Sequence, residues 1–281
     1  MTSIPVTVQV GMVAPAVMNV PLWAAQAAGE FKRRGLLIDS RIIGSTEGTT
    51  NALLAGDIDV ALGTADPALT DPDRVRILAG LVDRPPLSLV CRLGLTGFAD
   101  LRGKFLGTTS LREGTVQLIQ AMLGEHGLHY PGDYSFVLAG AHPQRWQALQ
   151  DATIDAAMQL MPFDFIAQDA GYPVLGRAED VVPEFAFSSA CVRADWAGDG
   201  ANADVAEAFR NALLAGESLV RADRDRAAAI IAEQAHISLD YARRCVHRLV
   251  DDGVMPDGLV HSERALARTR QAIADGAAVA A

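Results

Sequence analysis

The chain has 281 residues, half of them hydrophobic, and carries a formal net charge of −10 at pH 7. So much apolar side chain is atypical of a disordered chain and suffices for one large core or two moderate ones. The 24 basic residues are scattered along the sequence rather than clustered, which excludes a nucleic-acid-binding surface.

The first strand is expected to begin at about Val6, which leaves no room for a signal peptide in front of it. No apolar run approaches the roughly twenty residues that cross a bilayer, so we expect no transmembrane segment. As written, the sequence predicts a cytoplasmic protein, whereas removal of a leader would make it periplasmic, and the sequence leaves both open. Cys91, Cys191 and Cys245 lie far apart without CxxC spacing and are expected to be free thiols.

The first half of the chain alternates strands, loops and helices, the pattern that builds a parallel sheet covered by helices. The expected strands end at Gly11, at Gly44 and near Leu62. In open α/β sheets, ligands bind outside the carboxyl ends of the strands, where helix N-termini present unpaired N–H groups. The ligand loops predicted in this way are residues 12–19, 44–48 and 63–66.

An internal repeat extends this pattern to the second half. Three landmarks recur with one spacing, because 107 − 11, 140 − 44 and 154 − 58 each equal 96. The repeat predicts two lobes of the same design, with a second set of ligand loops at residues 108–115, 140–143 and 159–164. The landmarks are Gly11 and Gly107, Gly44 and Gly140, and Ile58-Asp59 and Ile154-Asp155.

Two extended runs, residues 85–93 and 184–193, are expected to cross between the lobes and to form a hinge. Lobe 1 would then comprise residues 1–90 and 190–281, and lobe 2 residues 91–189. Four helices are predicted near the C-terminus, the first three with Asp or Ser near the start as a plausible N-cap, and all four would pack on the first lobe. They cover about residues 204–220, 223–234, 238–251 and 261–274.

The residues quoted next resemble a known family across almost the whole chain. They are PLWAAQAAGEFKRRGL from Pro21, LLAGDIDVALGTADPAL from Leu53, LSLVCR with FADLRGKFLGT, and EFAFSSACVRADW from Glu184. In this order they resemble the periplasmic substrate-binding proteins of the nitrate/sulfonate/taurine (SsuA/TauA) and NMT1/THI5-like group. The resemblance implies an α/β fold of the bilobal type II periplasmic-binding-protein kind: two βαβ lobes, two crossing strands and C-terminal helices. It does not imply one ligand.

The loop that opens the first helix of the second half is the most informative. Thr109 and Ser110 offer hydroxyls that can cap the helix, and Gly114 permits close approach of the backbone. Arg112 can clamp a carboxylate or a sulfonate with two hydrogen bonds. We therefore expect this half to hold the acidic end of a ligand. The ligand-binding residues predicted here are Thr109, Ser110, Arg112, Gly114, Thr115, His142, Gln159 and Phe163.

The first half offers hydroxyls, soft apolar side chains and negative charge. Met12 can cover the organic body of a ligand, and Asp66 is expected to cap a helix. Glu47 is favoured at a helix N-terminus, and together with Asp66 it would repel a nitrate but tolerate an amine or amide. The ligand-binding residues predicted here are Met12, Met18, Asn19, Ser45, Thr46, Glu47, Thr64 and Ala65.

These features predict a binding protein, without cofactor or metal, that closes a two-lobed cleft on a small-molecule ligand. The ligand would be a small organic acid or heteroaromatic compound of the sulfonate, carboxylate or pyrimidine-precursor class, and the resemblance implies an ABC permease as partner. The sequence leaves open a cytoplasmic lyase, decarboxylase or hydrolase of a small aromatic or carboxylic acid on the same fold. Its candidate groups are His142 or Cys91 with Glu47, although Cys91 is expected to be a buried structural residue.

Overall fold

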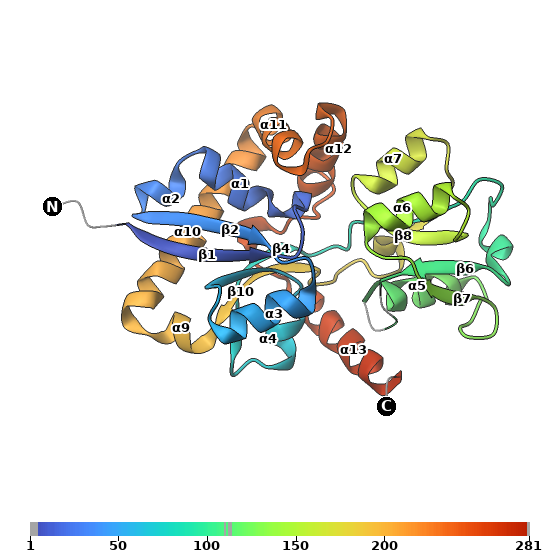
Figure 1. Ribbon diagram of the computed structural model, residues 1–281, viewed down its shortest axis with the longest axis horizontal. Helices are drawn as coiled ribbons and strands as arrows, with labels where there is room; N and C mark the ends of the chain where they lie inside the picture. The colour runs from blue at the N-terminus through green and yellow to red at the C-terminus, as the bar shows by residue number, and fades with distance from the viewer. Residues whose placement is uncertain (1–4, 110, 112–113, 280–281) are drawn as a thin grey trace. The chain divides into compact units, whose positions relative to one another are not determined.

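The structure is a computed structural model that describes residues 5–109, 111 and 114–279. The chain divides into two compact units (Figure 1). Unit 1 runs to Arg84 and resumes from Phe185 to Arg270, and unit 2 runs from Pro85 to Glu184 and resumes at Gln271. The chain thus leaves unit 1 at 84 rather than the expected 90 and re-enters it at 185 rather than 190.

Unit 1 contains a five-stranded sheet in the order β2-β1-β3-β10-β4. β1 is parallel to β2 and β3, whereas β10 lies antiparallel between β3 and β4. The sheet is therefore mixed rather than purely parallel, because the second crossing run enters it from the opposite direction. The strands are β1 Val6–Met12, β2 Leu36–Ile42, β3 Val60–Gly63, β4 Val75–Val82 and β10 Ser188–Arg193.

Unit 2 repeats this sheet in the order β7-β6-β8-β5-β9. Here the first crossing run supplies β5, which lies antiparallel between β8 and β9. Each crossing run thus becomes an interior strand of the sheet that it enters. The strands are β5 Leu87–Cys91, β6 Phe105–Thr108, β7 Ser135–Leu138, β8 Ala156–Leu160 and β9 Val174–Arg177.

The internal repeat is confirmed down to single hydrogen bonds. In unit 1 the carboxylate of Asp59 accepts from the backbone N–H of Gln9 at 2.8 Å, and in unit 2 that of Asp155 accepts from Phe105 at 2.9 Å. The strand register also shifts by 96, because Met12 pairs with Ile42 and Thr108 with Leu138. The core positions correspond in the same way: Leu53, Ile58 and Ala61 in unit 1, and Leu149, Ile154 and Ala157 in unit 2.

The helices of unit 1 cover both faces of its sheet. The connection from β1 to β2 and the one from β2 to β3 run in opposite directions along the sheet, which places α1 and α3 on opposite faces (Figure 1). α10 packs on α1, with Gly216 against the backbone of Pro21. The helices are α1 Val20–Ala27, α2 Glu30–Arg33, α3 Thr46–Ala55, α4 Asp66–Thr70, α9 Ala194–Gly198, α10 Gly200–Ala222, α11 Arg224–Ala235 and α12 Leu239–Val250, with short turns η1 Val17–Asn19 and η3 Asp257–Leu259.

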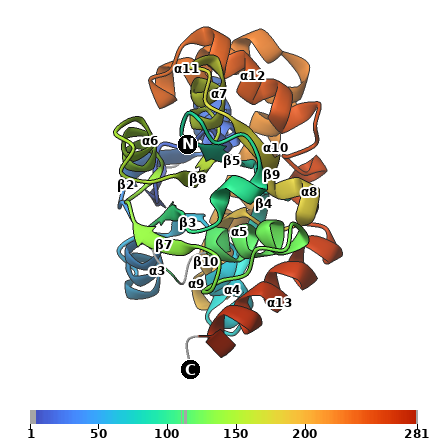
Figure 2. The same ribbon diagram turned by 90° about the vertical axis from the view of Figure 1, so that its right-hand side faces the viewer.

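In unit 2, α5, α6 and α7 correspond in the repeat to α1, α3 and α4, and α5 and α6 lie on opposite sides of the strands (Figure 2). Among the residues that the structure describes, no helix of either unit is long and apolar enough to cross a membrane. The helices are α5 Gly114–Glu125, α6 His142–Gln150, α7 Phe163–Asp169 and α8 Ala178–Val181, with the short turn η2 Phe98–Leu101.

The C-terminal helices are confirmed, and two of them begin at the polar residues that the sequence indicates. Asp223 and Ser238 accept from backbone N–H groups at the starts of α11 and α12, at 3.0 and 3.3 Å, and Ser262 does so before α13, Glu263–Val279. From Gln271 onward α13 belongs to unit 2, where Gln117 Nε2 donates to the carbonyl of Ala272 at 2.7 Å. The expectation that every C-terminal helix packs on the first lobe is therefore wrong for this end of α13.

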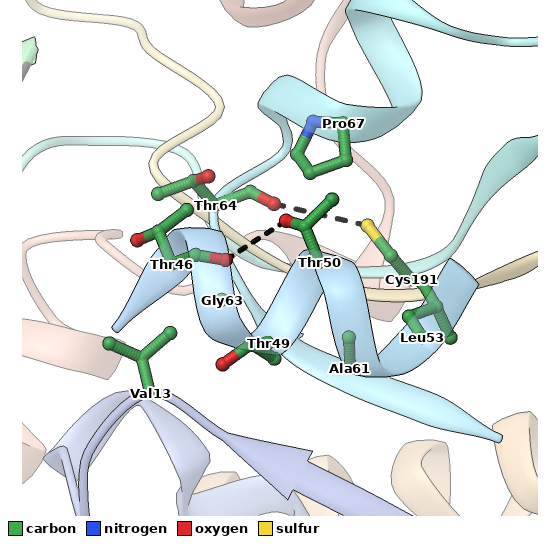
Figure 3. Close-up of a pocket in the computed structure, with 10 residues that line it drawn as sticks. All are labelled: Val13, Thr46, Thr49, Thr50, Leu53, Ala61, Gly63, Thr64, Pro67 and Cys191. Carbon is green, nitrogen blue, oxygen red and sulfur yellow. Dashed lines mark hydrogen bonds between the residues drawn. The ribbon is translucent and has the colours of Figure 1, made fainter. Parts of the chain in front are cut away.

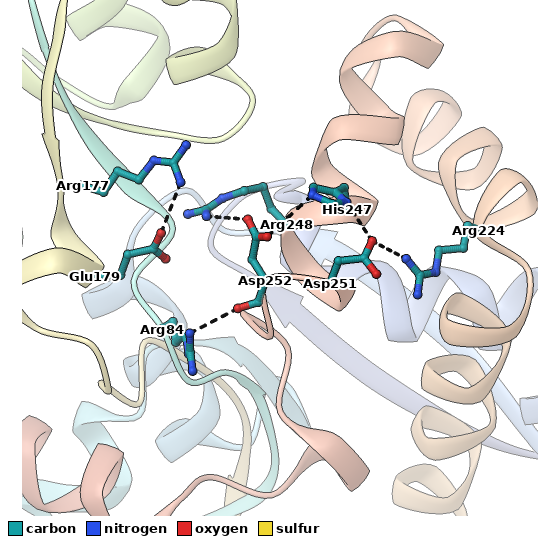
Figure 4. A network of polar contacts seen from close by, with 8 residues as sticks. All are labelled: Arg84, Arg177, Glu179, Arg224, His247, Arg248, Asp251 and Asp252. Carbon is teal, nitrogen blue, oxygen red and sulfur yellow. Dashed lines mark hydrogen bonds and ion pairs between the residues drawn. The ribbon is translucent and has the colours of Figure 1, made fainter.

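The end of α12 is tied into unit 1 by charged contacts (Figure 4). The buried Arg248 pairs with Asp252 at 2.7 Å, and Asp251 pairs with both His247 and Arg224. Positive side chains are favoured at a helix C-terminus, where the last carbonyls lack partners. Arg84 also donates to the carbonyl of Asp252, so the last residue before the first crossing is held against this helix end.

Candidate functional site

A hollow lies at the carboxyl end of β3 in unit 1, and residues from all three ligand loops predicted in the first half line it (Figure 3). Its cavity volume of about 10 Å³ leaves room for roughly one water-sized group. Hydroxyl and small apolar side chains surround it, and none of the lining side chains is charged. The lining residues are Val13, Thr46, Thr49, Thr50, Leu53, Ala61, Gly63, Thr64, Pro67 and Cys191.

The start of α3 forms one wall of this hollow. Ser45 caps the helix, with its hydroxyl accepting from the N–H of Gly48 at 3.0 Å. Thr49 donates its hydroxyl to the carbonyl of Ser45 at 2.7 Å, and Thr50 donates to that of Thr46 at 2.9 Å. Because these hydroxyl protons bond to the helix backbone, Thr49 and Thr50 offer oxygen lone pairs rather than donors to anything in the hollow.

The opposite wall carries Thr64, and its hydroxyl oxygen is buried without a hydrogen-bond partner in the part of the chain that the structure describes. The thiol of Cys191 donates weakly to the carbonyl of Thr64 at 3.9 Å. Burial, with the negative Asp66 as a second cause, raises the pKa of Cys191 to about 12, so this thiol is protonated at neutral pH. Burial also raises the pKa of Asp66.

Asp66 does not cap α4, and this corrects the sequence interpretation. Ala65 holds the N-cap position without a side-chain bond, and Asp66 is the first helical residue, followed by Pro67. Pro67 fits the first turn because it lacks the N–H that would be unpaired there. The Asp66 carboxyl is half-buried and acts on the neighbouring thiol of Cys191.

The remaining residues predicted in unit 1 are distributed between core and surface. Met12, Met18 and Ala65 are buried, and Asn19 donates its amide to Met12 Sδ at 3.5 Å and to the carbonyl of Ala14 at 3.0 Å. Asn19 is therefore engaged in holding the turn after β1. Ser45 and Glu47 are exposed at the start of α3.

In unit 2 the side chain of Thr109 is bonded within the chain. Its hydroxyl donates to the carbonyl of Gly140 at 3.0 Å and accepts from Arg145 Nη2 at 3.3 Å. Arg145 on α6 is only 2% exposed, which places a buried positive charge beneath the loop after β6. Sequence reasoning missed Arg145, although the repeat aligns it with Thr49, which is also buried.

His142 and Gln159 link the start of α6 to the end of β8. His142 Nδ1 accepts from the N–H of Leu160 at 3.2 Å, while Gln159 donates to the carbonyl of His142 at 3.2 Å and accepts from the N–H of Trp146 at 3.0 Å. Burial, and then the charge of Arg145, lower the pKa of His142 to about 3. His142 is therefore neutral at physiological pH, and its Nδ1 lone pair is already engaged.

The remaining residues predicted in unit 2 are Ser110, Arg112, Gly114, Thr115 and Phe163. Ser110 and Arg112 lie outside the described residues. Gly114 is exposed and is the first described residue of α5. Thr115 follows Gly114, with its hydroxyl oxygen buried and unpartnered among the described residues, and Phe163 is half-buried at the start of α7.

Inside unit 1 a serine contacts a histidine, which in turn contacts an aspartate, as in the catalytic triad of serine hydrolases. Ser189 Oγ lies 2.7 Å from His261 Nε2, and His261 Nδ1 contacts the carboxylate of Asp83. Ser189 is completely buried and His261 is 7% exposed, so no substrate can reach the hydroxyl. The His261 ring also packs against Gly80, where a side chain would collide with it. We interpret these contacts as structural.

The thiols are expected to resist alkylation in the native protein. Cys91, Cys191 and Cys245 are buried, and burial, with Asp155 as the next cause, raises the pKa of Cys91 to about 12. Since the thiolate is the reactive form, iodoacetamide at pH 8 should leave all three unmodified until urea unfolds the chain. Mass spectrometry of native and unfolded samples checks this, and rapid native labelling of Cys91 would contradict it.

Among the residues that the structure describes, no three His, Cys, Asp or Glu side chains are placed to share a metal ion.

Comparison with family models matches residues 18–227 to the model described as NMT1/THI5 like. The chain belongs to the NMT1/THI5-like family. A comparison with curated proteins finds no significant match.

Solved structures support the fold of this NMT1/THI5-like chain. The ligand-binding component of an ABC-type import system from Staphylococcus aureus, with zinc bound, has a TM-score of 0.79 at 14% identity and covers 98% of this chain and 92% of its own. The alkanesulfonate-binding protein SsuA from Xanthomonas axonopodis pv. citri, bound to MOPS, has a TM-score of 0.75 at 16% identity, covering 96% and 92%. The periplasmic nitrate-binding protein NrtA from Synechocystis PCC 6803 has a TM-score of 0.71 at 16% identity and covers 84% of this chain and 69% of its own.

These similar structures carry different ligands, so the shared architecture does not identify one for this NMT1/THI5-like chain. They agree in the type II periplasmic-binding-protein fold, which confirms the fold class expected from the sequence. The side chains at the strand ends are therefore the features that can indicate the ligand.

Proposed function

We propose that this NMT1/THI5-like chain is a solute-binding protein for a small organic acid or heteroaromatic ligand of the sulfonate, carboxylate or pyrimidine-precursor class. The observation that carries the proposal is the duplicated sheet of an NMT1/THI5-like chain, in which both units end their central strands in polar loops. One of these strand ends holds the hydroxyl-lined hollow. An ABC-type permease is the partner that would receive the ligand.

We propose that unit 2 holds the acidic end of the ligand at the loop after β6. The charge of the buried Arg145 lies beneath this loop, and its contact to Thr109 fixes the backbone there. A positive charge in a medium of low dielectric attracts an anion more strongly than the same charge in water. Unit 1 carries Glu47 and Asp66 near its hollow, so it is the less favourable place for an acid group.

The enzymatic alternative gains no support from the described residues that were its candidates. Cys91 is buried with a pKa raised to about 12, and His142 is neutral with Nδ1 engaged, so neither offers an activated nucleophile or general base. Glu47 is exposed on α3.

The proposal is tested by titrating the purified protein with sulfonates, carboxylates and aminopyrimidines in isothermal calorimetry and thermal-shift screens. We expect at least one class to bind and to raise the melting temperature, because a ligand that binds only the native state stabilises it. Mass spectrometry after long incubation should recover the ligand unchanged. No binder in any class would contradict the proposal, and product formation would favour the enzyme.

Within any class that binds, Thr109→Ala should weaken affinity about tenfold, because the proposed acid site loses the hydrogen bonds that join Thr109 to Gly140 and to the buried Arg145. Met12→Leu, which nearly conserves volume, should change the affinity little. Calorimetric dissociation constants of the two variants decide this, and equal small losses would overturn the assignment of the acid group to unit 2.

A further inference from the structure

The hollow in unit 1 has a repeat-related counterpart in unit 2, and the two are filled differently. Adding 96 to the positions that line the hollow gives their equivalents in unit 2. At three of these positions a small residue in unit 1 corresponds to a large nitrogen-bearing side chain in unit 2. The pairs are Thr46 and His142, Thr49 and Arg145, and Gly63 and Gln159.

In unit 2 two of these three side chains, Arg145 and Gln159, act as donors inside the chain. Arg145 Nη2 donates to the hydroxyl of Thr109, and Gln159 donates to the carbonyl of His142. Arg145 and Gln159 are 2% and 0% exposed, so the space around them is closed. Unit 1 has the same strand and helix positions but lacks these side chains, and space for about one water-sized group is left in their place.

The polar atoms around the hollow are suited to receive a donor. The hydroxyl oxygen of Thr64 is buried without a partner among the described residues, and buried polar atoms of this kind are normally hydrogen-bonded. Thr50 has already donated its proton to the carbonyl of Thr46 and can only accept (Figure 3). A hydrogen-bond donor in the hollow therefore finds acceptors on both sides.

The charges nearby favour a donor over an anion. None of the lining residues is a lysine, arginine or histidine, and the carboxyl of Asp66 acts on the thiol of Cys191 in the wall. Glu47 adds a second acidic group in the first turn of α3. The N–H of Gly48, which could otherwise attract an anion, is bonded to Ser45.

We propose that the hollow of unit 1 binds one amino nitrogen of the ligand, in the space that donor side chains of the chain itself occupy in unit 2. This inference rests on the proposed function and narrows it to acids or heteroaromatic compounds that carry an amino group. An ammonium would be matched by the acidic side chains, and an aromatic amino group by the threonine oxygens.

The test uses pairs of compounds that differ only in the amino group: 3-aminopropanesulfonate with propanesulfonate, and 4-aminobenzoate with benzoate. Calorimetric dissociation constants are measured for the wild type and for Thr64→Val, which keeps the shape but removes the unpartnered hydroxyl. Gly63→Ala is a second variant, since its added methyl group would enter the hollow 3.2 Å from Val13 and needs only a small shift. Thr7→Val, on the exposed start of β1, is the matched control.

We expect the amino member of a bound pair to bind about tenfold or more tightly to the wild type and to the Thr7→Val control, which corresponds to one good hydrogen bond to a charged group. Both hollow variants should remove most of this preference. Equal affinity of the two members in the wild type would overturn the inference while leaving the proposed function standing. A preference that persists in both hollow variants would also overturn it. Failure of these four compounds and of the aminopyrimidines of the first screen to bind would overturn the proposed function and the inference together.

Discussion

Replacing Asp83 with alanine should lower the free energy of unfolding by about 3 kcal/mol or more, since the partners of a buried charged group are left unpaired. The carboxylate of Asp83 contacts His261 Nδ1 and accepts from the backbone N–H of Ser262 at 2.7 Å. Its backbone carbonyl accepts from Phe185 at 2.7 Å and its N–H donates to Val254 at 3.0 Å. Asp83 thus lies just before the first crossing run and is hydrogen-bonded both to the second crossing run, at Phe185, and to Ser262 before α13.

Urea unfolding followed by tryptophan fluorescence measures this loss, since Trp23 and Trp196 both lie in unit 1. Asp71→Ala is the control, because the Asp71 carboxylate makes only an exposed ion pair with Arg74 at 3.6 Å. Exposed pairs of this kind contribute roughly 0 to 1 kcal/mol. An equal, small shift of the midpoint in both variants would show that the buried contacts of Asp83 do not stabilise the fold.

Gly216→Ala should cost about 2 kcal/mol or more, although alanine is the better helix former by roughly 1 kcal/mol. A Cβ atom at Gly216 would overlap the carbonyl oxygen of Pro21 and lie 3.0 Å from the nitrogen of Ala25. Both obstacles are backbone atoms of α1, so no side chain can rotate aside. α10 would have to move away from α1 and open a gap in the packing between them.

The matched control is Gly200→Ala in the same helix. Gly200 is exposed at the start of α10, and nothing lies within 4 Å of the Cβ position. Alanine should therefore be neutral there or stabilising by up to about 1 kcal/mol. Thermal unfolding of the two variants side by side checks the prediction, which is contradicted if Gly216→Ala melts at or above the wild-type temperature.

The repeat made most of the fold predictable from the sequence. Ile58 and Asp59, and their equivalents Ile154 and Asp155, combine a buried side chain with a carboxylate that bonds the neighbouring strand. Because both residues have a fixed place relative to the strand, their constant spacing of 96 predicted that the second half repeats the design of the first. The antiparallel strands were harder to predict, since a short apolar run such as residues 87–91 does not show which neighbours it pairs with.

The site was less predictable, because it depends on contacts between distant segments. Thr46 and Thr64 were expected from their places at strand ends, and the structure brings them to one hollow. Cys191 reaches the same hollow from a strand 127 residues after Thr64, which no local pattern reveals. Arg145 was missed because arginine is rarely buried, and its burial follows from an enclosed position that Thr49 fills in unit 1.

The insertion of β10 between β3 and β4 has a consequence for how the chain folds. The sheet of unit 2 is built entirely from residues 87–177, whereas that of unit 1 needs β10, which ends at Arg193. During synthesis, the ribosome therefore releases every strand of unit 2 before it releases the last strand of unit 1. Until then β3 and β4 lack the strand that separates them, and their unpaired edges can pair with other chains. Newly made unit 1 therefore carries two open strand edges until residue 193 has been released.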